Sequence, residues 1–114
     1  MLEDNLLSQC FKHLWNNFPE SRYKCWHVAN ERKCSYIEGN KLKAKGVLRG
    51  VPDLVINRNS KAYYIEFKSE KGKQSQDQII IQQALESEGF IYFLVNSFEQ
   101  FKIIIEKIYE RSIE

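Results

Sequence analysis

Residues 51–68, VPDLVINRNSKAYYIEFK, hold two apolar runs with a short polar stretch between them. The first run, 51–56, and the second, 62–68, are rich in the β-branched and aromatic residues that are typical of strands. The intervening 57–61 contain Asn and Ser, whose side chains favour turns because they hydrogen-bond the local backbone. The stretch therefore predicts a hairpin of two antiparallel strands.

The second strand of this hairpin alternates apolar and charged residues. Side chains of a strand point to its two faces in turn. Ile65 and Phe67 therefore share one face, which can enter the core. Glu66 and Lys68 share the other face, where a charged pair is expected to line a cleft. Asp53 begins the neighbouring strand, so pairing within the hairpin can bring it close to Glu66.

Two carboxylates that converge in this way form a site for a hard cation. Mg²⁺ binds one or two carboxylates and keeps waters for a phosphate substrate. Asp53 and Glu66 would be the ligands, and the backbone carbonyl of Phe67 would be a further one. Lys68 would hold the attacking water or stabilise the developing charge. The alternative interpretation is an ordinary edge strand with Glu and Lys on its wet face, next to a Pro-Asp turn.

Upstream of the hairpin, apolar residues recur at three- and four-residue spacing from Leu2 to Phe18. This periodicity predicts an amphipathic helix. Pro19 is expected to end it, because the residue before a proline is pushed out of helical geometry. A short strand is predicted at 24–29.

Residues 30–50 are polar and basic, and most of this segment is expected to be a loop. One helical turn is predicted at 41–45. Gly46 would end that turn, because glycine adopts the left-handed conformation common after a helix.

Downstream of the hairpin, two serines mark expected helix starts. Residues 75–78, SQDQ, have the form of a capping box, and the helix that follows is expected to end at Gly89. Residues 90–95 are apolar on both faces, which predicts a buried, central and parallel strand. Residues 97–100, SFEQ, are a second capping box, and the last helix places on one side Phe101, Ile104, Ile105 and Ile108.

The order of these elements is helix, strand, two hairpin strands, helix, strand and helix. It predicts an α/β sandwich with a central mixed sheet flanked by helices. We expect one domain, 1–114, because this length suits a single core and no linker interrupts it. The chain is 43% hydrophobic, which argues against disorder, and its longest apolar run is too short to span a membrane.

The three cysteines are odd in number and form no C-x-x-C pair. We therefore expect reduced thiols in a cytoplasmic protein, since the chain also opens without the pattern of a secretory signal. Cys10 with His13, and Cys25 with His27, match no common zinc module. The expectation is that Cys10 and Cys25 fill the core and that Cys34 lies in a loop.

The formal net charge of +2 conceals an uneven distribution. Residues 31–73 hold eleven Lys and Arg against five Asp and Glu, a net of +6, whereas the remainder has a net of −4. A basic surface around an acidic metal site suits a phosphate backbone, although a Lys-rich loop can also simply be solvated. The candidate DNA-binding residues are Lys41, Lys43, Lys45, Arg49, Lys71 and Lys73.

Residues 50–53, GVPD, followed by 66–68, EFK, resemble the motif of the PD-(D/E)xK nucleases. The surroundings are similar to the virus-type replication-repair nuclease domain, VRR-NUC, from Glu3 to about Phe98. The sequence departs from the commoner pattern at 29–31, where Pro and Gly usually flank the Asn. The segments that carry the wider resemblance are Glu3 with Gln9, 26–30, 41–47 and Ser75 with Gln78.

The resemblance implies a restriction-endonuclease-like fold and a Mg²⁺- or Mn²⁺-dependent DNA phosphodiesterase. Asp53 and Glu66 would bind the metal, and Lys68 would act in catalysis. Glu3 would add a carboxylate from the first helix, and Gln78 would support the site. Stand-alone members resemble junction resolvases, which act as dimers on branched DNA, and the setting would be a bacterial or phage-infected cell.

The leading hypothesis is therefore a metal-dependent DNA endonuclease for branched or structured DNA in replication, recombination or repair. One chain has one site, so symmetrical cutting of a junction needs a homodimer. The main alternative is a non-catalytic nucleic-acid-binding module on the same fold, which has no use for the Asp, Glu and Lys triplet. An adaptor or oligomerisation protein is a third hypothesis, and it would not need the basic centre.

Overall fold

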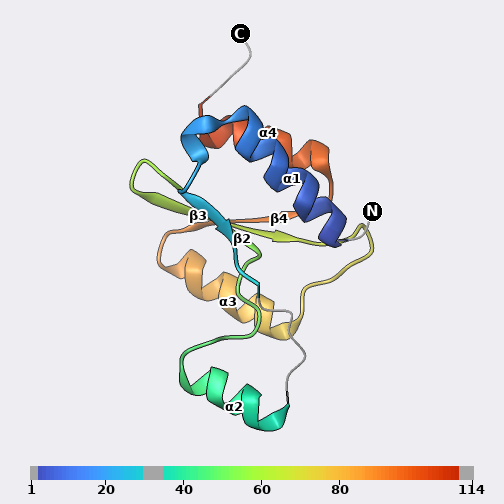
Figure 1. Cartoon of the computed structure of the whole chain (residues 1–114), viewed down its shortest axis with the longest axis vertical. Coiled ribbons are helices and arrows are strands. Elements are labelled where there is room, and N and C mark those ends of the chain that lie inside the picture. The colour runs from blue at the N-terminus through green and yellow to red at the C-terminus, as the bar shows by residue number, and fades with distance from the viewer. Residues whose placement is uncertain (1–2, 30–34, 111–114) are drawn as a thin grey trace.

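The predicted hairpin lies at the centre of the sheet in the computed structural model, which describes residues 3–29 and 35–110 (Figure 1). Strands β2 (Leu54–Arg58) and β3 (Lys61–Phe67) pair antiparallel, with Leu54 opposite Ile65. The turn is tighter than predicted, because both strands extend into 57–61 and leave only two residues between them. The expectations for Leu2, Asn30 and Cys34 lie outside the described residues.

The turn residues Asn59 and Ser60 both have positive φ, 52° and 64°. Two left-handed residues in a two-residue loop form the turn whose twist matches that of the flanking strands. Asn tolerates this conformation well, whereas in Ser the Cβ atom comes too close to the following carbonyl oxygen, which costs free energy.

Replacing Ser60 by Gly is therefore expected to stabilise the protein by about 0.5–1 kcal/mol, because glycine adopts positive φ without a steric cost. A thermal melt followed by circular dichroism measures the change. The control is Asn59→Gly, where we expect a smaller gain. A lower melting temperature for Ser60→Gly would contradict this reading of the turn.

Strand β1 (Cys25–His27) pairs antiparallel with β2, and β4 (Ile91–Val95) pairs parallel with β3, giving the order β1-β2-β3-β4. The parallel pairing of 90–95 confirms the prediction. The prediction that this strand is central was wrong, because β4 is at the edge of the sheet. Ile91 is 47% exposed and Leu94 is 44% exposed. The run is apolar on both faces although only one of them enters the main core. Strand β1 is shorter than the predicted 24–29.

One face of the sheet carries the core. Helices α1 (Glu3–Asn17) and α4 (Phe98–Ile108) cover this face side by side, and a short 3-10 turn, Pro19–Ser21, follows α1 (Figure 1). Cys10 and Cys25 are buried there as expected, and burial raises the pKa of the Cys10 thiol to about 12. The core side chains are Leu6, Cys10, Leu14, Phe18, Cys25, Leu54, Ile56, Ile65, Phe67, Val95, Phe101, Ile105, Ile108 and Tyr109.

Helix α3 (Gln76–Ser87) lies on the opposite side of the sheet (Figure 1). Its start confirms the first capping box, in which the Ser75 hydroxyl accepts from the Gln78 N–H and the Gln78 side chain accepts from the Ser75 N–H. At the start of α4, one of the two hydrogen bonds expected for the second capping box forms and the other does not. The Ser97 hydroxyl accepts from the Gln100 N–H, but the Gln100 side chain accepts from Asn96 instead.

Helix α2 (Tyr36–Ala44) is longer than the single turn predicted at 41–45. Ser35 caps it, with its hydroxyl accepting from the Glu38 N–H at 3.1 Å. This helix start was not predicted, because the polar composition of the segment suggested a loop. None of its residues is buried, and Figure 1 shows it beyond α3 and apart from the α1–α4 layer.

The fold is thus the predicted α/β arrangement of a mixed four-stranded sheet with helices packed around it. No helix in the described part of the chain is long and apolar enough to cross a membrane.

Candidate active site

Asp53 lies directly before β2 and is held from two sides. Its Oδ2 atom accepts a 2.7 Å hydrogen bond from the backbone N–H of Phe67 on β3. Its carbonyl oxygen accepts from the Val28 N–H at 2.9 Å and from Nδ1 of His27 at 2.6 Å. The backbone is thereby tied to the end of β1 while the carboxylate reaches across the hairpin. Asp53 thus lies beside Phe67, the residue that follows Glu66.

Glu66 is fully buried, with 0% of its surface exposed. The Tyr92 hydroxyl donates to its Oε1 atom, and the Gln74 amide donates to the same oxygen at 3.3 Å. Its Oε2 atom is also buried, makes no hydrogen bond within the described residues, and has Lys68 Nζ at 3.6 Å. Burying a carboxylate costs free energy unless hydrogen bonds or opposite charges satisfy both of its oxygens. A Glu66 Oε2 atom that is buried without a hydrogen bond therefore does not serve the stability of the fold.

Lys68 directly follows β3, and its backbone N–H donates to the Val95 carbonyl at 2.9 Å. Its side chain is 15% exposed, whereas its partner Glu66 is inaccessible to solvent. The separation of 3.6 Å is longer than a hydrogen bond, so the ammonium stays close to Glu66 and keeps its donors available for another acceptor.

The backbone carbonyl of Phe67 belongs to the same arrangement. The Phe67 side chain is buried in the core and contacts the ring of Phe101, with 5.9 Å between centroids. Its N–H points to Asp53, and the N–H and C=O of one strand residue point to the same side. The carbonyl therefore faces the Asp53 side of β3, where a hard cation would need it.

The residues present suit a divalent metal ion. The donor set is two carboxylates and a carbonyl, all oxygens, as Mg²⁺ prefers. The buried Oε2 atom of Glu66 has no hydrogen bond within the described residues, and such an ion would be its missing partner. Asp53, Glu66 and the Phe67 carbonyl are thus the residues that would hold it.

A hydrogen-bond chain behind Glu66 was not predicted from the sequence. Gln74 donates to Glu66 and also to Oε1 of Gln82 at 2.8 Å, and Gln82 in turn donates to Glu86 at 3.4 Å. Tyr92 completes the set on β4. The available signal was Tyr92 itself, since a tyrosine inside an apolar run needs a partner for its hydroxyl when it is buried.

The Tyr92 hydroxyl stays protonated in this setting. Burial raises its pKa, and the hydrogen bond to Glu66 and the negative charges of Glu66, Asp53 and Glu86 raise it further. Tyr92 is therefore a fixed donor that orients the Glu66 carboxylate.

Replacing Tyr92 by Phe is expected to weaken Mg²⁺ binding by about 10- to 100-fold, the usual effect of losing a group that orients a metal ligand. The Mg²⁺ concentration needed for half-maximal thermal stabilisation measures this without relying on activity. Tyr64→Phe is the control, because Tyr64 is the partner of Tyr92 on β3 and the change is identical. Equal Mg²⁺ requirements in the two variants would remove Tyr92 from this role.

Two predicted residues lie less directly at the site. The Gln78 side-chain oxygen accepts from the Ser75 N–H at 2.8 Å, so in this structure the Gln78 side chain is engaged in the capping box. Glu3 is exposed in the first turn of α1, which packs against β3. Across residues 3–29 and 35–110, no group of three or more His, Cys, Asp or Glu side chains is arranged to hold a metal ion.

The six predicted DNA-binding residues are all exposed and fall into two groups. Lys41, Lys43, Lys45 and Arg49 lie on α2 and just after it, whereas Lys71 and Lys73 lie in the loop between β3 and α3. Of these, Lys73 lines the same pocket as Lys68, whose Nζ atom lies 3.6 Å from Oε2 of Glu66. The structure thus brings Lys73 of the loop group to the site, whereas the α2 group lies on and after a helix beyond α3 (Figure 1).

A mixed sheet with an Asp before one hairpin strand and Glu-x-Lys at the end of the next is the arrangement of PD-(D/E)xK-type nuclease domains. The VRR-NUC domain model matches residues 12–99, and the chain belongs to the VRR-NUC family. This family implies a nuclease with a divalent metal, and the fold is consistent with the restriction-endonuclease-like architecture.

Two solved structures share this fold. A VRR_NUC domain protein is 19% identical, with a TM-score of 0.76 and coverage of 96% of this chain and 89% of its own. A second structure, a VRR_NUC domain, is 20% identical, with a TM-score of 0.57 and coverage of 87% and 92%. A comparison with curated proteins gives no match.

Proposed function

We propose that this protein is a Mg²⁺- or Mn²⁺-dependent DNA endonuclease. The single observation that supports this best is the fully buried Glu66, whose Oε2 atom has the Lys68 ammonium nearby and no hydrogen bond within the described residues. Asp53, Glu66 and the Phe67 carbonyl would hold the ion, with Gln78 and Glu3 as supporting residues. A module that only binds nucleic acid has no need of a buried carboxylate with one oxygen that lacks a hydrogen bond.

The chain's own residues would act on the phosphate as follows. The divalent ion, when bound, supplies a Lewis acid and lowers the pKa of a water. Lys68 donates hydrogen bonds to that water or to the phosphate oxygens, where negative charge develops. Water adds to phosphorus, the bond to the leaving oxygen breaks, and the proton from water ends on that oxygen or in solvent.

The substrate is proposed to be branched or otherwise structured DNA, in replication, recombination or repair. The support is the basic segment 31–73, which places exposed lysines both beside the site and on α2. Cations at two separate positions suit a substrate with more than one duplex arm. The proposal places the protein in the cytoplasm, with the DNA that it cuts.

The experiment is a cleavage panel with purified protein. Labelled four-way junctions, flaps, single strands and linear duplexes are incubated with Mg²⁺, Mn²⁺ or a chelator. We expect cutting that requires the metal and is fastest on branched substrates. Binding without cutting, on every substrate and with both metals, would instead favour the nucleic-acid-binding module.

A homodimer is part of the proposal, because each chain has one site and a junction requires two related cuts. Light scattering on the eluting protein measures the mass in solution. A monomer at every working concentration would rule out paired cutting by a stable dimer.

A further inference from the structure

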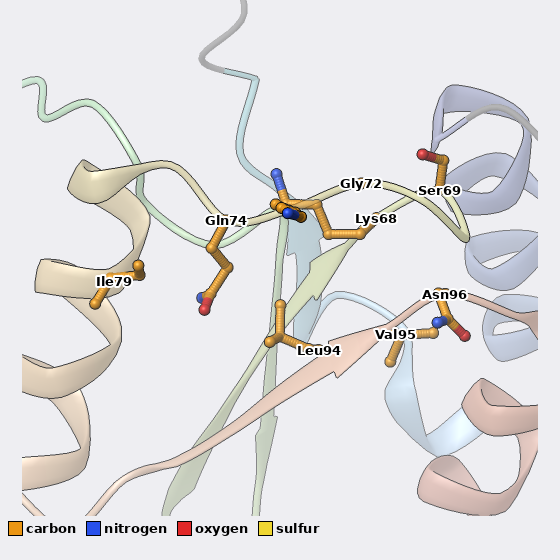
Figure 2. Close-up of a pocket in the computed structure, with 9 residues that line it drawn as sticks. Lys68, Ser69, Gly72, Gln74, Ile79, Leu94, Val95 and Asn96 are labelled. Atoms are coloured by element: carbon orange, nitrogen blue, oxygen red, sulfur yellow. The ribbon is translucent and has the colours of Figure 1, made fainter.

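An open pocket of about 440 Å³ lies directly beside the candidate active site. In Figure 2 the loop that carries Ser69, Gly72 and Gln74 runs along one side of it, and the end of β4 runs along the other. Ile79 of α3 lies at one end. The volume is within the range of small-ligand sites in proteins.

This pocket shares two residues with the site around Glu66. Lys68 lines the pocket and keeps its ammonium 3.6 Å from Glu66 Oε2. Gln74 also lines it and donates to Glu66 Oε1 at 3.3 Å. Whatever enters the pocket therefore lies next to the point where the scissile phosphate would be held.

The lining combines three kinds of chemistry. Lys68 and Lys73 supply positive charge, the carboxamide oxygen of Gln74 supplies an acceptor because its two N–H groups are already used, and the carboxamide of Asn96 supplies both donors and acceptors. Leu94 and Ile79 supply aliphatic surface, and Leu94 remains 44% exposed although it is on the sheet face that carries Glu66. A ligand that matches all three has a negative charge, polar hydrogen-bonding groups and an apolar surface.

We propose that this pocket takes an unpaired nucleotide of the DNA substrate, adjacent to the phosphate that is cut; the inference rests on the proposed function and specifies its substrate. A nucleotide has the phosphate, the polar base edge and the apolar base face that the lining matches. A paired base has its faces covered by stacking and its edge engaged, so only an unpaired or extruded nucleotide can enter. The pocket thereby selects DNA with unpaired nucleotides beside the cleavage point.

The test compares affinities in a chelator, where no cutting occurs, by fluorescence anisotropy. Three DNAs of equal length and charge are used: a fully paired duplex, a duplex with a single-stranded flap, and the same flap made of abasic nucleotides. We expect about tenfold tighter binding of the normal flap than of the other two, since covering part of an apolar base face with aliphatic side chains contributes roughly this much. The abasic flap separates recognition of the base from simple attraction of its phosphates.

Leu94→Glu places a charge on the aliphatic wall without touching the carboxylates or Lys68. It is expected to reduce the preference for the normal flap over the abasic flap to about twofold or less, because the base then meets a charge, whereas repulsion of the phosphates affects both flaps alike. The matched control is Ile103→Glu on α4, which is 56% exposed and outside the pocket lining. A circular dichroism melt confirms that both variants fold.

Four outcomes decide between the possibilities. Equal binding of normal and abasic flaps by the unmodified protein would overturn the inference, as would an equal loss of preference in Leu94→Glu and Ile103→Glu. Metal-dependent cutting without any flap preference would leave the nuclease proposal standing and overturn only the pocket. A base-dependent flap preference in a protein that never cuts would support the pocket and overturn the nuclease proposal.

Discussion

Replacing Asp53 by Asn is expected to reduce DNA cleavage by more than about 100-fold, since even residues that only orient a metal ligand typically contribute 10- to 100-fold. The variant loses the negative charge that would bind the cation. The amide oxygen of Asn can still accept from the Phe67 N–H, which Oδ2 of Asp53 does at 2.7 Å. Asn thus separates the chemistry of this residue from its structural role.

Asp53→Ala would be a poorer test, because it also leaves the buried Phe67 N–H without its acceptor, at a cost of about 1–3 kcal/mol. Single-turnover cleavage at saturating Mg²⁺ measures the loss in Asp53→Asn, and anisotropy in chelator checks that DNA binding is retained. Asp77→Asn is the matched control for the charge, since Asp77 is exposed in the first turn of α3. Cleavage within threefold of the unmodified rate would exclude Asp53 from catalysis.

Replacing Gly50 by Ala is expected to have the largest effect on stability. Gly50 has a φ of +85°, and a Cβ atom there would lie 2.6 Å from the Asp77 carbonyl carbon and 2.7 Å from the Gln78 nitrogen. Both atoms are backbone in the first turn of α3, which has no freedom to rotate away. The loop that leads to Asp53 therefore packs directly on α3 only because residue 50 lacks a side chain.

Gly89 offers an unusually close control. Its φ is +91°, and nothing lies within 4 Å of the position where its Cβ would be. Gly89→Ala thus carries the backbone cost alone, whereas Gly50→Ala adds an overlap that typically costs about 1–3 kcal/mol. Thermal melts should place Gly50→Ala below Gly89→Ala by about 10 °C, given about 4–8 °C per kcal/mol for a domain of this size.

Gly50→Ala should also reduce cleavage at temperatures where it is still folded, because the displaced loop moves Asp53 relative to Glu66. Gly89→Ala should leave cleavage nearly unchanged. Equal melting temperatures in the two variants would show that the loop tolerates a side chain, and would break the link between α3 and the position of Asp53.

Much of the fold was predictable because its signals are local. Alternation along 62–68 assigns Ile65 to the core and Glu66 to the opposite face, and both assignments hold. The helix starts at Ser75 and Ser97 depend on side chains three residues away, so they too could be found. The extent of α2 was missed, because its segment is so polar that the cap at Ser35 was the only signal.

The sequence by itself determined the hairpin, the two faces of β3, the main helices and the residue types of the candidate metal site, since these depend on neighbours within a few positions. Only the tertiary structure decided that β4 is an edge strand, that Glu66 is fully buried, and that Tyr92 and Gln74 are its donors. Tyr92 is 26 residues from Glu66 along the chain. Such pairings arise from how α3 and β4 pack beside β3, which no local pattern encodes.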